Sequence, residues 1–219
     1  MFCTVFVFAN IEAGSKTLIH AGKLIDGKSD LIQSKMSVVI EGNLITDVKE
    51  GYLSTTDYDE YIDLRDYTVL PGLMDMHVHF GQEYQSKAQA PIKVERETQA
   101  ILATQHAYVT FKSGFTTVRQ VGDSGLVAIS LRDAINAGKL VGPRIFAAGK
   151  TIATTGGHAD PTNGRALDDY AYPVPEQGVV NGPYEVYAAV RQRYKDGACL
   201  LYTSPSPRDV EESRMPSSA

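Results

Sequence analysis

The sequence predicts an α/β protein in which a small β-sandwich layer precedes the first part of a (β/α)₈ barrel. In residues 17–69, short segments rich in β-branched residues alternate with turn residues, as in a β layer. In residues 70–198, strand-like and helix-like periods alternate three times, the pattern of βα units in a parallel sheet. A complete barrel needs eight such units and about 250 residues. We therefore expect a truncated barrel of about three units.

The composition is that of an ordinary globular chain, with 219 residues, 43% hydrophobic content and a formal charge of −5. The mild acidic balance and the scattered basic residues predict no nucleic-acid partner. No apolar run approaches the roughly 20 residues that span a bilayer, so no membrane span is expected. The two cysteines, Cys3 and Cys199, lie near the ends, which leaves no disulfide or thiolate metal site between them. Assembly into a homo-oligomer stays open.

The first nine residues, Met1 to Ala9, are uncharged and mostly apolar, and they end in a small-residue pattern. They resemble the hydrophobic part and cleavage site of a secretory signal peptide that lacks its basic start. Residues 1–16 would then be a partial signal peptide and a mature N-terminus, and the protein would be secreted or periplasmic. The alternative is a short N-terminal strand in a cytoplasmic protein.

The end of the chain departs from the βα pattern. Residues 199–209 match, residue for residue, the translation of a transposon-end adapter from DNA sequencing libraries, and residues 213–219 match the flow-cell end of such an adapter. The residues between them fill a gap the size of a sample index. Composition alone would also fit a Ser/Pro-rich disordered tail. We interpret residues 199–219 as adapter-derived and exclude them from the fold prediction.

Residues 17–69 are predicted to form the N-terminal β layer. Its strand-like segments are residues 17–22, 36–40, 44–48 and 61–64, and the last of these leads through residues 67–70 to the next part of the chain. Glu41-Gly-Asn43 between two of them is a hairpin signal. These strands are too few to enclose a core alone. His20 lies in the first segment, and we expect it to be a partly exposed structural residue.

Residues 70–198 are predicted to form the partial barrel. Its expected strands are residues 73–79, 115–121 and 143–148, and its expected helices are residues 93–112, 126–137 and 183–195. A glycine suited to a helix C-terminus follows each helix, at Gly114, Gly138 and Gly197. In the first helix, one apolar side is formed by Ile101, Leu102, Tyr108 and Val109. His106 in the same helix is expected to be a packing residue.

The stretch Leu70-Pro-Gly-Leu-Met-Asp-Met-His-Val-His-Phe80 carries the strongest chemical signal. His77 and His79 are two residues apart, so in a strand their rings leave the same face. The opposite face is apolar through Met74, Met76, Val78 and Phe80. Two histidines on a buried strand are costly unless each has a partner, and a metal ion suits neutral imidazole. We predict that His77 and His79 bind a metal; two solvent-facing histidines are the alternative.

Polar residues also follow the other two strands, and in parallel α/β folds functional groups collect at these strand ends. Arg119 and Asp123 follow the second strand, and we interpret them as structural rather than catalytic. The third strand runs into Thr154-Thr-Gly-Gly-His-Ala-Asp160, where paired glycines allow a ligand close to the backbone. His158 and Asp75 are predicted to contact substrate or to support the active-site groups. A plain turn with an exposed histidine is the alternative for the loop.

The motif Leu-Pro-Gly-Leu-x-Asp-x-His-x-His at residues 70–79, after a β layer and before a βα barrel, resembles the amidohydrolase superfamily. Residues 114–119, 142–145 and 155–160 resemble its imidazolonepropionase-related branch, which includes Xaa-Pro dipeptidase-like enzymes. The resemblance extends over roughly residues 17–198. It implies a metal-dependent hydrolase with a TIM barrel that acts on carbon–nitrogen bonds of a small peptide or amide.

The resemblance also implies one or two divalent metals, usually zinc, at the C-terminal mouth of the barrel. His77 and His79 would bind the more buried one. The family's carboxylated lysine on strand four, its histidines on strands five and six, and its catalytic aspartate on strand eight are expected beyond Ala198. The catalytic residues are therefore not predicted within this chain. Lys195 lies in the helix before strand four and does not match that lysine.

Three functional hypotheses follow. The intact protein is a dipeptidase-like hydrolase, and the fragment itself is inactive because most ligands are missing. Alternatively, the protein is a metal-free scaffold of the same fold that acts by interaction, although the retained His77 and His79 argue against this. The third hypothesis is a non-functional translation of a truncated sequencing read.

Overall fold

The computed structural model describes residues 14–81, 95–123, 125–163 and 174–201. The chain divides into two compact units, Met1–Gly72 and Leu73–Ala219. Most of the signal-like segment and residues 202–219 of the adapter-like segment lie outside the described residues. In the part of the chain that is described, no helix is both long and apolar enough to cross a bilayer.

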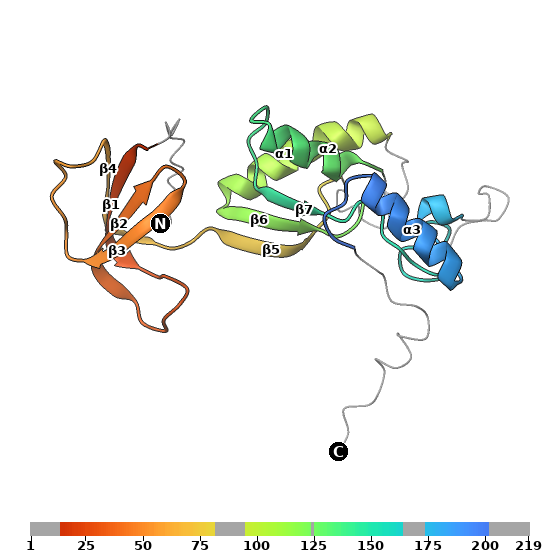
Figure 1. Ribbon diagram of the computed structural model, residues 1–219, viewed down its shortest axis with the longest axis horizontal. Helices are drawn as coiled ribbons and strands as arrows, with labels where there is room; N and C mark the ends of the chain where they lie inside the picture. Colours follow the sequence, from red (N-terminus) through yellow and green to blue (C-terminus); the bar gives the residue numbers. More distant parts are fainter. Residues whose placement is uncertain (1–13, 82–94, 124, 164–173, 202–219) are drawn as a thin grey trace, which may run out of the picture. The chain divides into compact units, whose positions relative to one another are not determined.

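The first unit is built on a four-stranded sheet with the order β3-β2-β1-β4 (Figure 1). Its strands are β1 (Lys16–Leu24), β2 (Gln33–Glu41), β3 (Leu44–Glu50) and β4 (Glu60–Val69). β2 runs antiparallel to β1 and β3, and β4 runs parallel to β1. The predicted hairpin is present, since Glu41 pairs with Leu44 and Gly42 adopts a φ of +58°. The predicted β layer is confirmed as a mixed sheet.

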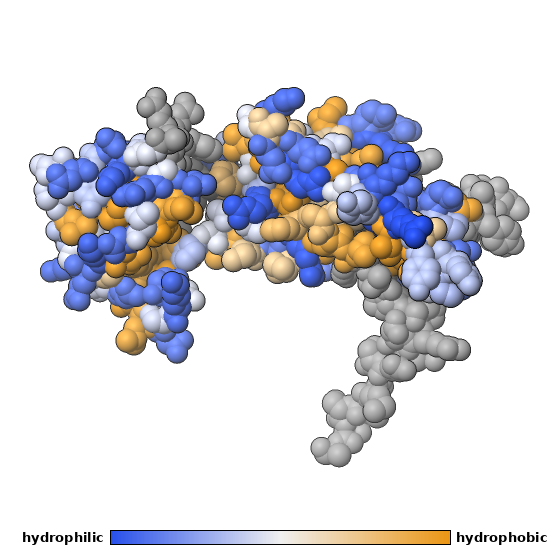
Figure 2. Space-filling view, in the orientation of Figure 1, coloured by the Kyte–Doolittle hydropathy of each residue, from blue (hydrophilic) through white to orange (hydrophobic). Residues whose placement is uncertain are grey.

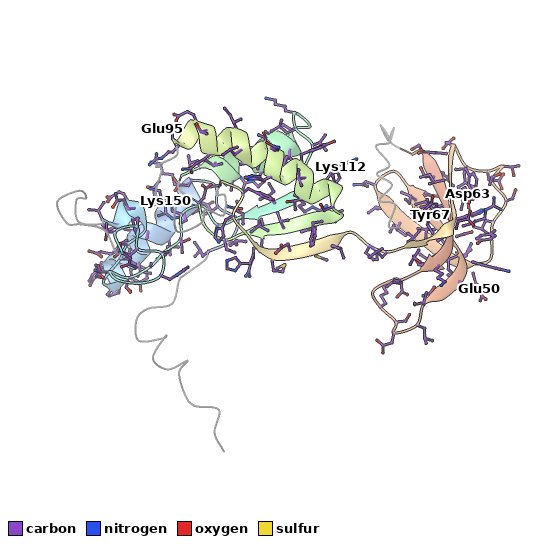
Figure 3. All side chains as sticks on the ribbon, turned by 180° about the vertical axis from the view of Figure 1, so that it is seen from behind. Glu50, Asp63, Tyr67, Glu95, Lys112 and Lys150 are labelled. Carbon is purple, nitrogen blue, oxygen red and sulfur yellow. The ribbon has the colours of Figure 1, made fainter. Side chains whose placement is uncertain are left out.

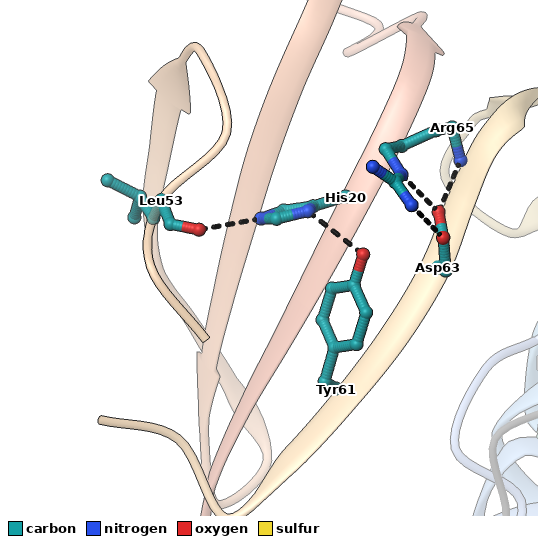
Figure 4. Close-up of polar contacts among 5 residues, drawn as sticks. All are labelled: His20, Leu53, Tyr61, Asp63 and Arg65. Carbon is teal, nitrogen blue, oxygen red and sulfur yellow. Dashed lines mark hydrogen bonds and ion pairs between the residues drawn. The ribbon is translucent and has the colours of Figure 1, made fainter. Parts of the chain in front are cut away.

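His20 on β1 is buried in this unit, at 4% exposure, so the expected partial exposure is wrong. The segment after β3 covers it: the ring of Tyr52 lies 4.7 Å from the imidazole, centroid to centroid. His20 Nε2 lies 3.1 Å from the carbonyl of Leu53, and Nδ1 lies 3.1 Å from the Tyr61 hydroxyl (Figure 4). Because a carbonyl can only accept, Nε2 carries the proton. Both ring nitrogens have partners, which supports the structural role expected for His20.

The second unit contains a three-stranded parallel sheet with the order β5-β6-β7. The strands are β5 (Leu73–Val78), β6 (Phe115–Gln120) and β7 (Arg144–Ala147). The connecting helices are α1 (Arg96–Lys112) and α2 (Val127–Asn136), and both lie on the same face of the sheet (Figure 1). A short 3₁₀ helix, η2 (Pro175–Gln177), and α3 (Pro183–Lys195) follow. Parallel strands with helices on one face confirm the predicted partial barrel.

The core of the second unit lies between the sheet and its helices. Its buried members are Phe80, Ala103, Ala107, Val118, Val127, Ala128, Ile129, Leu131, Ile145 and Ala147. α1 approaches the sheet through Ala103 and Ala107, whose small side chains allow close packing. The apolar side expected for this helix is not its buried side, because Ile101 is 70% exposed and Val109 is 55% exposed. α1 therefore packs against the sheet through its small residues.

The helix ends lie within one residue of the expected bounds except at the start of α1. We expected this helix from residue 93, but Glu95 still has an extended backbone and the helix begins at Arg96. Glu95 lies at the N-terminal end and Lys112 at the C-terminal end (Figure 3), where a negative and a positive charge respectively interact favourably with the helix macrodipole. α3 has the predicted bounds.

β5 lies at the edge of the described three-stranded sheet, and its apolar face is covered only in part. Val78 and Phe80 pack into the core as expected. Met74 and Met76 are 68% and 55% exposed, so the apolar face of this strand is buried only near its carboxyl end. Apolar surface accordingly remains visible on the second unit (Figure 2).

After α3 the chain returns to the sheet. The backbone N–H of Cys199 donates to the carbonyl of Ala147 on β7 over 3.0 Å. A fourth strand of a barrel would pair at this edge of β7. Residue 199 thus lies at the edge of β7 where such a strand would pair.

Candidate metal-binding site at the strand ends

His77 and His79 converge at the carboxyl end of β5. Their Nε2 atoms lie 3.2 Å apart, and their ring planes meet at 72°. An ion about 2.1 Å from each nitrogen, the usual Zn–N distance, would subtend an angle of roughly 100° between them, close to tetrahedral. Both side chains are exposed, so an ion has access. The pair therefore fits a shared divalent metal.

The orientation of His79 is set by a backbone carbonyl on the neighbouring strand connection. His79 Nδ1 lies 3.2 Å from the carbonyl oxygen of Gly122. Since the carbonyl can only accept, Nδ1 carries the proton and Nε2 keeps its lone pair. A metal-binding histidine is commonly held in this way by a partner on its other nitrogen.

Asp75 supports the same strand end through the backbone. Its Oδ1 accepts a hydrogen bond of 3.0 Å from the backbone N–H of His77. The carboxylate therefore acts on the main chain that carries the imidazole. This contact agrees with the supporting role predicted for Asp75, and contact with substrate stays a prediction.

Three hydrogen bonds join the ends of the parallel strands beneath the histidines. Arg119 Nε donates to the carbonyl of Met76 over 2.7 Å, and the backbone N–H of Val121 donates to Val78 over 3.3 Å. The backbone N–H of Ala148 donates to the carbonyl of Gln120 over 3.0 Å. The strand end that presents the histidines is thus tied to the rest of the sheet.

Asp123 accepts a hydrogen bond from the backbone of the next helix. Its Oδ2 accepts a 2.5 Å hydrogen bond from the backbone N–H of Ala128, in the first turn of α2. Arg119 and Asp123 therefore both use their side chains on backbone groups, in keeping with the structural interpretation of the two.

The loop that carries His158 is organised around Asp160, for which no role was predicted from the sequence. Asp160 is 5% exposed, and its carboxylate accepts hydrogen bonds from Gly156 N (2.8 Å), Thr162 N (2.9 Å) and Thr162 Oγ1 (2.7 Å). Burial would raise the pKa of Asp160, but these hydrogen bonds outweigh it and hold the pKa below its ordinary value. An aspartate two residues before a threonine is a turn signal that could have been recognised. His158 itself is exposed.

The structure brings only part of the predicted site together. His77, His79 and Asp75 share one strand end, and His158 forms no possible metal-binding group with them among the described residues. Those residues also contain no group of three or more His, Cys, Asp or Glu side chains arranged to hold a metal. The described part of the chain thus supplies two candidate metal ligands, and the role of His158 stays a prediction.

Comparison with known proteins gives the family. Residues 68–205 match the model of the amidohydrolase family. A solved Xaa-Pro dipeptidase with methionine bound in its active site is 85% identical with a TM-score of 0.83, over 86% of this chain and 47% of that one. A solved prolidase complexed with N-methylphosphonate-L-proline is 28% identical with a TM-score of 0.72, over 86% of this chain and 46% of that one.

A curated relative is similar over a comparable length. Ochratoxinase from Aspergillus niger is 26% identical over 215 residues, which are 89% of this chain and 43% of the relative. The chain thus spans about half the length of the proteins that it matches. With its parallel βα units, its converging histidine pair and a family match over most of its length, the chain belongs to the amidohydrolase family.

Proposed function

We propose that the intact protein is a metal-dependent hydrolase of amide or peptide bonds, with dipeptides as its substrates. The observation that carries the proposal is the 3.2 Å separation of the Nε2 atoms of His77 and His79 at the end of a barrel strand. Similarity to a Xaa-Pro dipeptidase at 85% identity supports dipeptides as the substrate class. That protein holds methionine in its active site, which supports an amino-acid moiety in the substrate.

A divalent metal, zinc by family resemblance, would supply Lewis acidity that polarises a scissile carbonyl and lowers the pKa of a coordinated water. His77 and His79 would hold it through their Nε2 lone pairs. The carbonyl of Gly122 keeps His79 in the required tautomer, and Asp75 steadies the backbone of His77. These residues bind and orient, and the described chain contains no group assigned to proton transfer.

We infer that the 219-residue chain is inactive by itself. A catalytic zinc normally takes three protein ligands and leaves a fourth position open, whereas the described residues supply two. The chain should therefore bind zinc weakly and turn over no substrate. Purified chain incubated with zinc and Xaa-Pro dipeptides provides the check, and robust hydrolysis would contradict the inference.

A chimera tests the proposed function of the intact protein. Residues 17–198 would replace the equivalent part of the solved Xaa-Pro dipeptidase, whose high identity over this region favours correct assembly. We expect the chimera to hydrolyse Xaa-Pro dipeptides, to lose activity with a chelator and to recover it with zinc. His77→Ala or His79→Ala should abolish activity while the chimera stays folded. A folded chimera that retains full activity without both histidines would overturn the proposal, and a folded chimera that binds no metal would favour the scaffold hypothesis.

A further inference from the structure

We propose that Gln120 is a positioning residue that fixes the imidazole of His79 for metal binding; the inference rests on the proposed metal site. Gln120 is the last residue of β6, and its side chain is 1% exposed. A buried amide is costly unless both its ends are paired. Here both ends are paired, and both partners adjoin His79.

The two hydrogen bonds of the Gln120 amide lie on either side of His79. Oε1 accepts from the backbone N–H of Phe80 over 2.9 Å, and Phe80 directly follows His79 in the chain. Nε2 donates to the carbonyl of Gly122 over 2.8 Å. The same carbonyl accepts from His79 Nδ1 over 3.2 Å. One amide therefore holds both the backbone that carries the imidazole and the carbonyl that orients it.

The chemistry of this position requires an amide. A primary amide offers one acceptor and one donor at the same end, which the Phe80 N–H and the Gly122 carbonyl need respectively. A carboxylate would satisfy Phe80 but would place a second acceptor against the Gly122 oxygen. The Gly122 carbonyl has two lone pairs, so it can accept from Gln120 and His79 together. Because the amide is buried, water cannot easily replace either bond.

The consequence for His79 is a fixed tautomer and a fixed ring direction. If the Gly122 carbonyl shifts, Nδ1 loses its acceptor and the proton can move to Nε2, which then has no lone pair for a metal. Partners that orient a metal-binding histidine typically contribute about 10- to 100-fold to metal affinity. Gln120 acts on the metal through Gly122 and His79 and need not touch it.

The test compares Gln120→Met with Val118→Ala in the 219-residue chain. Methionine keeps the volume of glutamine and removes both hydrogen bonds. Val118 is two residues earlier on the same strand and fully buried, so Val118→Ala weakens the same core without touching the amide contacts. The melting temperatures of the two variants would be measured, so that a similar loss of stability in both can be established. Gln120→Glu serves as a second variant, since it keeps the bond to Phe80 and loses the one to Gly122.

Histidine nitrogen NMR at a fixed pH of about 8 reports the tautomer directly. The chain has five histidines, and His79→Ala assigns the signal. We expect the Nδ1–H tautomer of His79 in the wild type and in Val118→Ala, and a mixture in both Gln120 variants. A titration with Zn²⁺ alone, monitored through the same NMR signals, should show about 10- to 100-fold weaker zinc binding in the Gln120 variants than in the wild type.

The outcomes separate the two proposals. An unchanged His79 tautomer in Gln120→Met, with zinc binding equal to that of Val118→Ala, would overturn the positioning role. If Gln120→Met changes the tautomer of His79 while a folded chimera that keeps Gln120 binds no zinc, the positioning of His79 is supported and the metal site is overturned.

Discussion

The Nε2 atoms of His77 and His79 lie 3.2 Å apart, within hydrogen-bond distance, at the exposed carboxyl end of β5. If an ion takes both lone pairs, removing either ring should be far more damaging than removing an orienting partner. We expect His77→Ala and His79→Ala to lower zinc affinity in the chimera by at least roughly 100-fold. Equilibrium dialysis against zinc provides the measurement.

His158→Ala is the informative control for these variants. His158 is exposed and lies in the loop that Asp160 organises. We expect this variant to keep its zinc affinity and, if His158 contacts substrate, to raise KM for a Xaa-Pro dipeptide several-fold. Loss of zinc on His158→Ala would instead place this histidine among the ligands.

Gly122 has no space for a side chain. A Cβ there would lie 2.6 Å from Thr151 Oγ1 and 3.4 Å from His79 Cε1. Gly122→Ala should therefore cost about 1–3 kcal/mol of stability as an overpacked site, and it should displace His79. Chemical denaturation and the histidine NMR signals report the two effects.

Two further variants show whether the effect is the predicted clash. Gly81→Ala adds a methyl group whose nearest neighbouring atoms lie 3.8 Å away, in ordinary van der Waals contact, so it should change stability by less than about 1 kcal/mol. Thr151→Ala combined with Gly122→Ala removes the nearest atom and should recover part of the lost stability. A double variant as unstable as Gly122→Ala alone would contradict the clash with Thr151.

Asp160→Asn should loosen the loop that follows β7. The amide keeps one acceptor oxygen and turns an N–H₂ group toward backbone donors that the carboxylate now satisfies. Leaving a buried donor unpaired costs about 1–3 kcal/mol. We expect faster hydrogen exchange at Gly156 and Thr162 and unchanged exchange in β1 to β4. Glu176→Gln, an exposed acid in the same unit, should leave exchange in the loop unaltered.

The ion pair between Asp63 and Arg65 predicts that the first unit loses stability in acid. Arg65 Nε and Nη2 donate to Asp63 over 2.8 and 2.6 Å (Figure 4), and these bonds lower the pKa of Asp63 to about 2. The folded pKa lies below the ordinary value of about 4. The stabilisation is therefore complete above pH of about 4 and is lost as the pH falls toward about 2.

The melting temperature between pH 2 and 6 checks this dependence. Asp63→Asn should melt with a shallower pH slope than the wild type between about pH 4 and 2. At neutral pH the wild type should be the more stable of the two, by a small margin because the pair is exposed and screened by solvent, and the two should converge as the pH approaches about 2. Asp66→Asn, an exposed acid on the same strand, is the matched control. Identical slopes in Asp63→Asn and the wild type would contradict the assigned pKa shift.

Local sequence patterns predicted the helices and strands well where proline, glycine or other turn residues mark their ends. Pro183 and Gly197 bracket α3, and its bounds are as expected. The Glu41-Gly-Asn43 hairpin also follows its turn residues. Patterns failed where burial depends on neighbours: α1 buries alanines rather than its large apolar residues. His20 is covered by a segment that begins more than thirty positions later in the chain.

For the candidate site, the sequence by itself determined the βα architecture, the family resemblance and the shared face of His77 and His79. All of these depend on spacing along the chain, which the alternation of a strand converts directly into geometry. Only the tertiary structure decided which nitrogen of His79 carries the proton and which residues hold it there. The Gly122 carbonyl is 43 positions from His79, and Gln120 is 40 positions from Phe80. Such contacts form only when parallel strands pair, so no local pattern records them.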